Sequence, residues 1–200
     1  MPYPAKRDTA PSFAELGVAA EIVDALSDLG ISHTFSIQEL AIPLALTGRD
    51  LIGQARTGMG KTFGFSVPLI DRVFDDADIA ELDGTPRALV VVPTRELAVQ
   101  VGEDIANAAK YTPVRATTIY GGRPYEEQIA ALEAGVDVIV GTPGRLIDLH
   151  DRGELRLDQV AVLVLDEADE MLDMGFLPDI EKLWGALPQP VQTMLFSATM

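Results

Sequence analysis

The sequence contains no cysteine, and its two histidines, His33 and His150, are far apart. A disulfide framework and a Cys-based metal site are therefore excluded, and two separated histidines cannot form a zinc site alone. Long apolar runs are also missing. No stretch approaches the ~20 residues needed to cross a bilayer, and no apolar export segment follows the N-terminus. These absences predict a soluble protein, without a membrane partner, in a reducing, cytoplasmic setting.

Positive charge is scarce, with 15 Lys and Arg against 31 Asp and Glu and a formal net charge of −16. General electrostatic binding of nucleic acid needs several basic groups against phosphates, so any such contact must be local. The same composition is also typical of a merely soluble acidic protein. With 200 residues, 48% of them hydrophobic, the chain can bury one sizeable core, and we expect a single domain.

The N-terminal part of the chain predicts a flexible segment followed by two helices. Residues 1–12 contain three prolines and no apolar periodicity, so we place the domain at 13–200. Apolar residues then recur at helical spacing. Those of the first helix are Val18, Ile22, Leu26 and Leu29, and those on one face of the second are Ile37, Leu40, Ala41 and Leu44.

From residue 50 onward, short apolar runs alternate with amphipathic helical windows. This alternation is the sequence form of βαβ units around a parallel sheet. The predicted strands are 50–53, 88–92, 116–120, 136–140, 161–165 and 193–196, and helices are expected to begin near Gly60, Thr94, Pro124, Pro143 and Phe176. We therefore predict an α/β fold with a central, mostly parallel sheet and helices on both faces.

A glycine-containing segment, residues 55–62, lies between the first predicted strand and a helix. Such a turn presents backbone N–H groups and a helix N-terminus to a phosphate chain. Lys61 would reach the β and γ oxygens, and the hydroxyl of Thr62 would hold Mg²⁺. The strict pattern has glycine where Ala55 stands, and the ending Gly60-Lys61-Thr62 can also mark an ordinary tight turn before a helix.

An acidic pair, Asp166 and Glu167, directly follows the apolar run 161–165, where a buried strand would reach the carboxyl edge of the sheet. Ligands of open α/β sheets bind at that edge. One carboxylate there can hold the hydration shell of Mg²⁺, and the next can orient or deprotonate an attacking water. The pair alone could equally be an acidic first helical turn. Together with Lys61 and Thr62, it predicts a site for a magnesium nucleotide.

Two further helix starts follow apolar strands at the same predicted edge. Each offers a threonine as N-cap and an arginine nearby, Thr94 with Arg95 and Thr142 with Arg145. Free N–H groups and a guanidinium make each a potential anion site, which could hold a phosphodiester backbone without a net basic surface. The threonines could also be plain caps and the arginines partners of surface carboxylates. The glycine pair 121–122 is either a third close-approach position or a plain turn.

Together these segments resemble the first RecA-like domain of a bacterial DEAD-box ATP-dependent RNA helicase, from about Phe13 to the end of the chain. The most specific element is the run Asp166-Glu167-Ala168-Asp169, the motif that names the family. The other matching motifs, in the family's order, are Gln38, Ala55 to Thr62, Pro93 to Ala98, Gly121-Gly122, Thr142 to Arg145 and Ser197-Ala198-Thr199. The resemblance implies a RecA-like fold with a phosphate-binding loop. An alanine at the position of Ala55 is the family's own habit.

The resemblance also implies ATP and Mg²⁺ as cofactors and assigns catalytic roles. Lys61 would contact the phosphates, Asp166 and Thr62 would hold Mg²⁺, partly through water, and Glu167 would be the base for the hydrolytic water. Gln38 would read the adenine edge. The nucleotide-binding residues implied in this way are Phe13, Ile31, Gln38, Ala55, Arg56, Thr57, Gly58, Met59, Gly60, Lys61 and Thr62.

RNA is the partner that the resemblance implies, bound through its backbone and independently of sequence. The residues that would line the backbone are Pro93, Thr94, Arg95, Gly121, Gly122, Thr142, Pro143, Gly144 and Arg145. Asp169 would hydrogen-bond Ser197 and Thr199 and so link the state of the ATP to the affinity for RNA. The expected activity is ATP hydrolysis coupled to local unwinding of RNA duplexes.

The chain departs from the family before Gln38, where a glycine-aromatic pair and a Pro-Thr pair are usual. Here the corresponding residues include Ile31 and Phe35. Ile31 can give a base an apolar contact but no aromatic stacking, and Phe35 lacks the usual hydroxyl. We therefore expect adenine selectivity to be less secure than phosphate binding. The aromatic that the family places further upstream is assigned to Phe13.

The sequence stops at Met200, directly after the motif 197–199, and no second RecA-like domain or arginine finger is present in it. Since the family closes ATP and RNA between two such domains, we expect a monomeric domain that binds nucleotide and is nearly inactive alone. Two other hypotheses remain. The chain could belong to a DNA-directed translocase of the wider helicase superfamily, or it could be a non-catalytic module that binds nucleotide or a partner.

Overall fold

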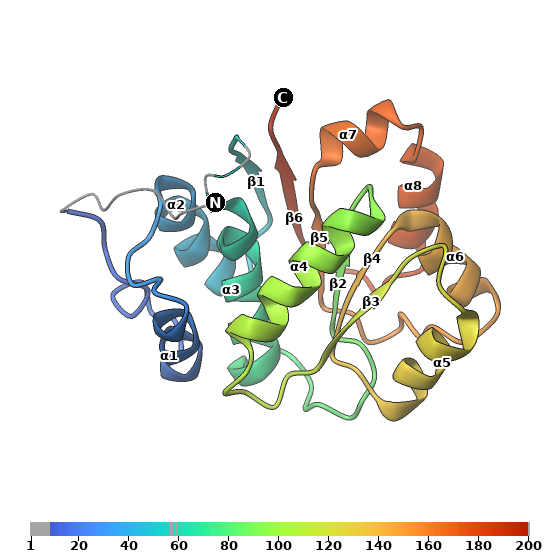
Figure 1. Cartoon of the computed structure of the whole chain (residues 1–200), viewed down its shortest axis with the longest axis horizontal. Helices are drawn as coiled ribbons and strands as arrows, with labels where there is room; N and C mark the ends of the chain where they lie inside the picture. The colour runs from blue at the N-terminus through green and yellow to red at the C-terminus, as the bar shows by residue number, and fades with distance from the viewer. Residues whose placement is uncertain (1–8, 57, 59, 200) are drawn as a thin grey trace.

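The computed structural model describes residues 9–56, 58 and 60–199, and within them the chain forms a six-stranded sheet flanked by helices (Figure 1). In chain order the elements are α1 (Ala20–Asp28), α2 (Ser36–Leu46), β1 (Leu51–Gln54), α3 (Lys61–Asp75), β2 (Ala88–Val91), α4 (Arg95–Ala108), β3 (Ala116–Ile119), α5 (Tyr125–Ala134), β4 (Val138–Gly141), α6 (Pro143–Asp151), β5 (Val162–Leu165), α7 (Ala168–Asp173), α8 (Leu177–Gly185) and β6 (Gln192–Ser197).

The strand order is β1-β6-β5-β2-β4-β3, and every pairing is parallel. The central strands β2, β4 and β5 are buried along their whole length, because helices cover both faces of the sheet. Their sequences are accordingly continuous apolar runs, with no polar residue reserved for a solvent face. The predicted α/β fold is confirmed. Each strand lies within two residues of its predicted bounds.

Strand alternation divides the core into two apolar clusters, one on each face of the sheet. Val90 of β2 belongs to the cluster covered by α1 to α4, whereas Leu89 and Val91 belong to the cluster covered by α5 to α8. Phe65 of α3 and Phe196 of β6 pack together in the first cluster, with ring centroids 5.3 Å apart. Figure 1 shows the same division, with α1 to α4 and α5 to α8 on either side of the strands.

The predicted inner face of the second helix is wrong. In α2 the buried residues are Gln38, Ala41, Ile42 and Ala45. Leu40 and Leu44 are 69% and 45% exposed. Apolar residues surround this helix on most sides, so periodicity alone does not define one face. A glutamine stands on the buried face because its amide is hydrogen-bonded there.

The structure describes only the last part of the predicted N-terminal segment. Of the segment 1–12, residues 1–8 lie outside the described part. Ser12 forms an antiparallel bridge with His33, and the Thr34 backbone N–H donates to the Pro11 carbonyl. Within the described ranges, no helix combines the length and the apolar character needed to span a membrane.

Candidate active site

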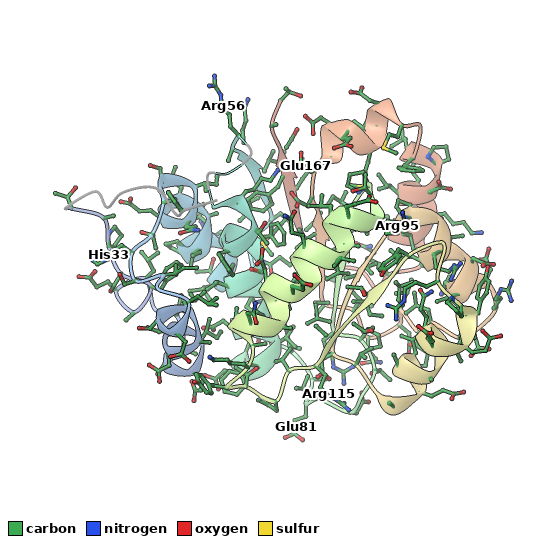
Figure 2. The ribbon with its side chains drawn as sticks, viewed as in Figure 1. His33, Arg56, Glu81, Arg95, Arg115 and Glu167 are labelled. Carbon is green, nitrogen blue, oxygen red and sulfur yellow. The ribbon has the colours of Figure 1, made fainter. Side chains whose placement is uncertain are left out.

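All the candidate motifs lie at the carboxyl edge of the sheet. Each motif from residue 55 onward follows a strand, and because the six described strands are parallel, their carboxyl ends share that edge. Gln38 precedes β1 and reaches the same edge from α2. Figure 2 shows Arg56, Glu167 and Arg95 toward one end of the molecule and Glu81 and Arg115 at the opposite end. The predicted residues Thr57 and Met59 lie outside the described residues. The other predicted residues lie at this edge, except Phe13 and Ile31, which belong to the apolar cluster behind it.

The centre of the site is a buried triad of charges formed by Lys61, Asp166 and Glu167. Lys61 Nζ lies 2.6 Å from Glu167 Oε1 and 3.3 Å from Asp166 Oδ1. The side chains of Lys61 and Asp166 are 7% and 1% exposed, and that of Glu167 is 18% exposed. Residues 106 positions apart in the chain therefore meet in one ion-pair cluster.

Burial and mutual attraction set the protonation of this triad. Burial raises the pKa of Asp166 to about 6, although the charge of Lys61 opposes the shift. Burial also acts to lower the pKa of Lys61, but the Asp166 and Glu167 carboxylates outweigh it and hold this pKa above its usual value. Lys61 therefore stays charged, while Asp166 titrates close to neutral pH.

The backbone on both sides of the triad takes left-handed conformations. Gly60, the N-cap of α3, has φ 76°, and a Cβ there would collide with the Phe35 ring and the Gln38 amide. Glu167, the N-cap of α7, has φ 53° and is the one described non-glycine residue with positive φ. Such a conformation is costly for a residue with a side chain and is concentrated at functional sites. It turns the chain sharply after β5 and directs Glu167 toward Lys61.

Gln38 lies against the phosphate-binding loop and is fully buried. Its Nε2 donates to the Gly60 carbonyl at 2.8 Å, and its Oε1 accepts from the Phe35 N–H at 2.9 Å. The amide thus links the start of α2 to the start of α3. Phe13 and Ile31, 1% and 8% exposed, belong to the apolar cluster behind it. Contact between these residues and a base stays a prediction.

Four of the predicted RNA-contact residues lie at or beside the starts of α4 and α6. The Thr94 hydroxyl accepts from the Leu97 N–H at 3.2 Å, so Thr94 is a true N-cap. The side chain of Arg95 is 60% exposed, and a Cβ on Gly122 would lie 3.4 Å from its Nη1. Arg145 stacks on the ring of Tyr125 with its guanidinium carbon 4.0 Å from the centroid.

The other predicted RNA-contact residues differ in what they present. Gly121 and Gly144 have open space where a Cβ would stand, which leaves room for the close approach of another backbone. Thr142 occupies the N-cap position of α6. Pro93 and Pro143 are buried, so their side chains shape the turns and face away from solvent.

Asp169 joins α7 to the end of β6. Its Oδ2 accepts from the Thr199 hydroxyl at 2.7 Å and from the Thr199 N–H at 3.2 Å. The hydrogen bond from Thr199 is the main cause that holds the pKa of Asp169 below its usual value. The Ser197 hydroxyl donates to the Thr199 carbonyl and accepts from its N–H at 3.2 Å. The other carboxylate oxygen of Asp169 is buried and has no hydrogen-bond partner among the described residues.

Tyr125 belongs to this edge and was not predicted there, because its sequence pattern indicates only an apolar stripe of α5. Its ring carries Arg145 on α6, and Arg152 Cζ lies 4.3 Å from the same centroid. Its hydroxyl donates to Asp148. The three partners lie 20 or more positions further along the chain, so no local motif could have indicated this arrangement.

A known protein family matches most of the chain. Residues 35–200 match the family model described as "DEAD/DEAH box helicase". The chain belongs to this family. The DEAD/DEAH box match spans all the motifs above except Phe13 and Ile31, which precede its first residue.

Curated relatives and solved structures agree with this membership. The chain is 48% identical over 189 residues to a "DEAD-box ATP-dependent RNA helicase CshA" of Geobacillus kaustophilus, a match that covers 94% of this chain and 39% of the relative. A CshA of Streptococcus pneumoniae is 46% identical over 188 residues, with 94% and 35% covered. The chain therefore spans well under half the length of these curated relatives.

Two solved structures share the fold. A DEAD box protein from Methanococcus jannaschii superposes with a TM-score of 0.85 at 39% identity, covering 94% of this chain and 50% of that one. A hypothetical ATP-dependent RNA helicase from Sulfolobus tokodaii gives a TM-score of 0.80 at 35% identity, covering 90% and 50%. The RecA-like fold that the sequence predicted is thereby confirmed.

Proposed function

We propose that this chain is the first RecA-like domain of an ATP-dependent RNA helicase, which binds Mg·ATP and the RNA backbone and couples hydrolysis to local unwinding of duplexes. The observation that carries the proposal is the triad of Lys61, Asp166 and Glu167, closed by contacts of 2.6 and 3.3 Å at the start of a helix. A cation for phosphate, a carboxylate for a metal shell and a carboxylate for water are the parts that nucleotide hydrolysis needs.

In the described structure Lys61 forms ion pairs with both carboxylates of the triad. A triphosphate placed on the turn 55–60 would compete for the same ammonium group, because its several charged oxygens are also strong acceptors for it. Transfer of Lys61 from Glu167 to the phosphates would leave Glu167 free to accept the proton of the attacking water. Nucleotide binding would thus create the base that hydrolysis requires.

The residues present fit Mg²⁺ of the kind that keeps most of its water. Among the described residues no group of three acidic or histidine side chains could enclose a metal ion. Mg²⁺ at nucleotide sites instead uses one or two protein ligands together with waters and phosphates. Thr62 and Asp166 would supply these ligands. The ion would neutralise charge that develops on the phosphates during transfer.

The RNA backbone would lie across the ends of β2, β3 and β4. This edge has cationic donors in the guanidinium groups of Arg95 and Arg145. The open glycines 121 and 144 add accessible backbone donors, although the whole chain carries a net charge of −16. Asp169, bonded to Thr199, would relay the state of the nucleotide to the RNA edge. Because curated relatives are more than twice as long as this chain, we also propose that a second RecA-like domain of the same protein completes the site.

The elevated pKa of Asp166 gives a pH test of the nucleotide site. An acid with a pKa near 6 is neutral below that pH and cannot act as an anionic metal ligand. We expect the factor by which Mg²⁺ strengthens nucleotide binding to fall about tenfold between about pH 8 and pH 5 in the wild-type protein. Isothermal titration calorimetry with and without Mg²⁺ measures it.

The matched control for that titration is Asp166→Asn. The phosphates of the nucleotide also titrate in this range, but their contribution is common to both proteins, so the difference between them isolates Asp166. The variant should show a weaker Mg²⁺ effect that changes only with the nucleotide's own titration. Identical pH profiles for the two proteins would exclude Asp166 from the metal shell.

A further inference from the structure

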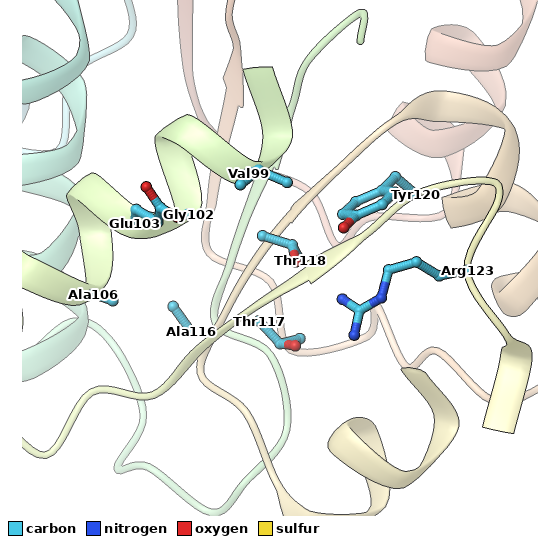
Figure 3. A pocket seen from close by; sticks show the side chains of 9 residues that line it. All are labelled: Val99, Gly102, Glu103, Ala106, Ala116, Thr117, Thr118, Tyr120 and Arg123. Atoms are coloured by element: carbon cyan, nitrogen blue, oxygen red, sulfur yellow. The ribbon is translucent and has the colours of Figure 1, made fainter. Parts of the chain in front are cut away.

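We call the ends of β2, β3 and β4, where the RNA backbone is proposed to lie, the RNA edge. A pocket of about 350 Å³ lies beside it, between the outer face of α4 and the strand β3 (Figure 3). Its walls include Val99, Gly102 and Glu103 from α4, and Thr118, Tyr120 and Arg123 from β3 and the turn that follows. None of these six residues belongs to the nucleotide site. The volume falls at the lower end of pockets that hold small molecules and is sufficient for a nucleoside.

The pocket is continuous with the glycine pair of the RNA edge. Tyr120 and Arg123 stand immediately before and after Gly121 and Gly122, so the turn that would receive a phosphate also forms one wall of the pocket. Gly121 is open at its Cα, and Gly122 has φ 87° and lies beside Arg95. If the phosphate of a nucleotide lies on this turn, its base can reach the pocket.

The chemistry of the walls suits a planar, polar ring. The Arg123 guanidinium carbon lies 5.5 Å from the centroid of the Tyr120 ring, and Nη2 of Arg123 is held by Glu127 at 2.9 Å. Aromatic rings and guanidinium planes are the surfaces on which proteins stack unpaired bases. Glu103 and the Thr118 hydroxyl add a hydrogen-bond acceptor and a hydroxyl that can donate or accept. In Figure 3 the Tyr120 hydroxyl and the Arg123 guanidinium both point back from the turn along β3, toward Thr118 and Thr117.

The floor of the pocket depends on a glycine in the middle of α4. A Cβ on Gly102 would collide with the methyl group of Thr118, so a side chain there would separate helix from strand. Glycine in a helix interior is destabilising relative to alanine, so its presence here needs a packing reason. Gly102 therefore permits α4 to pack closely on β3, and the pocket lies above this contact.

An extended peptide that pairs with the edge of β3 would be another occupant, but few backbone groups of this strand remain for such pairing. Gln128 of α5 is buried and already pairs with the last position of this edge: its Oε1 accepts from the Tyr120 N–H at 3.1 Å, and its Nε2 donates to the Tyr120 carbonyl at 3.3 Å. Only the four residues of the short strand 116–119 remain available for pairing with a peptide. The observations therefore favour a base over a strand.

We propose that the pocket receives one unpaired base of the RNA strand whose phosphate lies on the Gly121–Gly122 turn, stacked against Tyr120 and Arg123. The inference rests on the proposed RNA-binding function and adds to it a base contact within an interface otherwise made by the backbone. RNA binding then depends on the presence of a base at one position of the strand.

The experiment measures binding of the full-length protein to labelled single-stranded RNA by fluorescence anisotropy, in the presence of Mg²⁺ and a non-hydrolysable ATP analogue. The shortest RNA that binds is used, because a shift of register would then lose backbone contacts. A series of RNAs carries a single abasic ribose at each position in turn. One position is expected to weaken binding about tenfold, the rest far less.

Two variants connect that position to the pocket. Tyr120→Leu keeps apolar contact with the core but removes the ring, and Arg123→Gln changes a surface side chain that the core does not need. Both should bind the intact RNA about as weakly as the wild-type protein binds the abasic one, and the abasic substitution should then cost them nothing further. Tyr111→Leu, which removes an exposed tyrosine at the far end of α4, should retain the tenfold base effect.

The outcomes separate this inference from the function on which it rests. If the wild-type protein binds no RNA of any kind, the proposed RNA-binding function fails, and the base pocket fails with it. If RNA binds and the abasic series is flat, only the base pocket is overturned, and the β3 edge becomes a candidate for peptide pairing. An abasic effect that Tyr120→Leu and Arg123→Gln both leave intact would also overturn it, because the base would then lie elsewhere.

Discussion

Glu167→Gln in the full-length protein should reduce RNA-stimulated ATP hydrolysis by about 10²- to 10⁴-fold, the usual contribution of a general base. Glutamine has the same shape and its Oε1 can still accept a hydrogen bond from Lys61, but it cannot take a proton from water. Nucleotide affinity should therefore change little. Steady-state phosphate release and nucleotide binding, measured on the same preparation, give the two quantities.

The control for this variant is Glu170→Gln, which removes the same charge from an exposed position of α7. It should leave hydrolysis close to that of the wild-type protein. Turnover by Glu167→Gln equal to that by Glu170→Gln would show that Glu167 is not the base. The positive φ of Glu167 would then need another explanation, such as the turn between β5 and α7 alone.

Lys61→Ala should weaken nucleotide binding by about 10- to 100-fold, since charge-assisted hydrogen bonds contribute about 1.5–3 kcal/mol. It should also lower the free energy of unfolding of the nucleotide-free protein by about 1–3 kcal/mol, because it leaves two carboxylates without their cation, one of them 1% exposed. Calorimetry and chemical denaturation measure the two effects.

Lys182→Ala is the matched control for Lys61→Ala. Lys182 also pairs with a carboxylate, Asp151, at 2.6 Å, but both side chains are about half exposed. Exposed pairs contribute about 0–1 kcal/mol, so this variant should change neither nucleotide affinity nor stability appreciably. Nucleotide affinity that survives Lys61→Ala would contradict the assignment of the loop 55–62 to phosphate.

The sequence was enough to predict that Lys61 meets Asp166 and Glu167, because that meeting depends on topology. The loop at Lys61 and the pair at Asp166 each follow an apolar run, and parallel strands place such segments at one edge whatever their separation in the chain. That rule is enough to predict that residues more than 100 positions apart meet. It does not give their distances, and the close ion pairs between Lys61 and both carboxylates came only from the structure.

Other features depend on contacts between distant residues that no local pattern records. Periodicity assigned Leu40 and Leu44 to the inner face of α2, but the helix is anchored by the buried amide of Gln38. Helix α7 is six residues long and was not predicted, because so short a segment carries no measurable period. The left-handed backbone of Glu167 is likewise set by the fold around it, since nothing in a glutamate favours that conformation.

The acidic composition bears on how a nucleic acid could be held, and that contact stays a prediction. It predicts that any contact is local, and the structure places Arg95 beside Gly122 and Arg145 on the Tyr125 ring at one edge of the sheet. Arg145 owes its position to the Tyr125 ring, a stacking partner that the sequence did not reveal. Because salt screens exposed charges beyond about 10 Å, a few oriented cations at this edge would act on a phosphate largely independently of the net charge of −16.

The central claim is that this edge hydrolyses ATP in response to RNA, and the most direct test compares RNA with DNA. ATP turnover by the full-length protein is measured with single strands of equal length and sequence, one of RNA and one of DNA. We predict that RNA stimulates turnover strongly and that DNA does so weakly or not at all. Equal stimulation by both strands would identify a DNA-competent translocase instead, and no turnover with either would contradict the account.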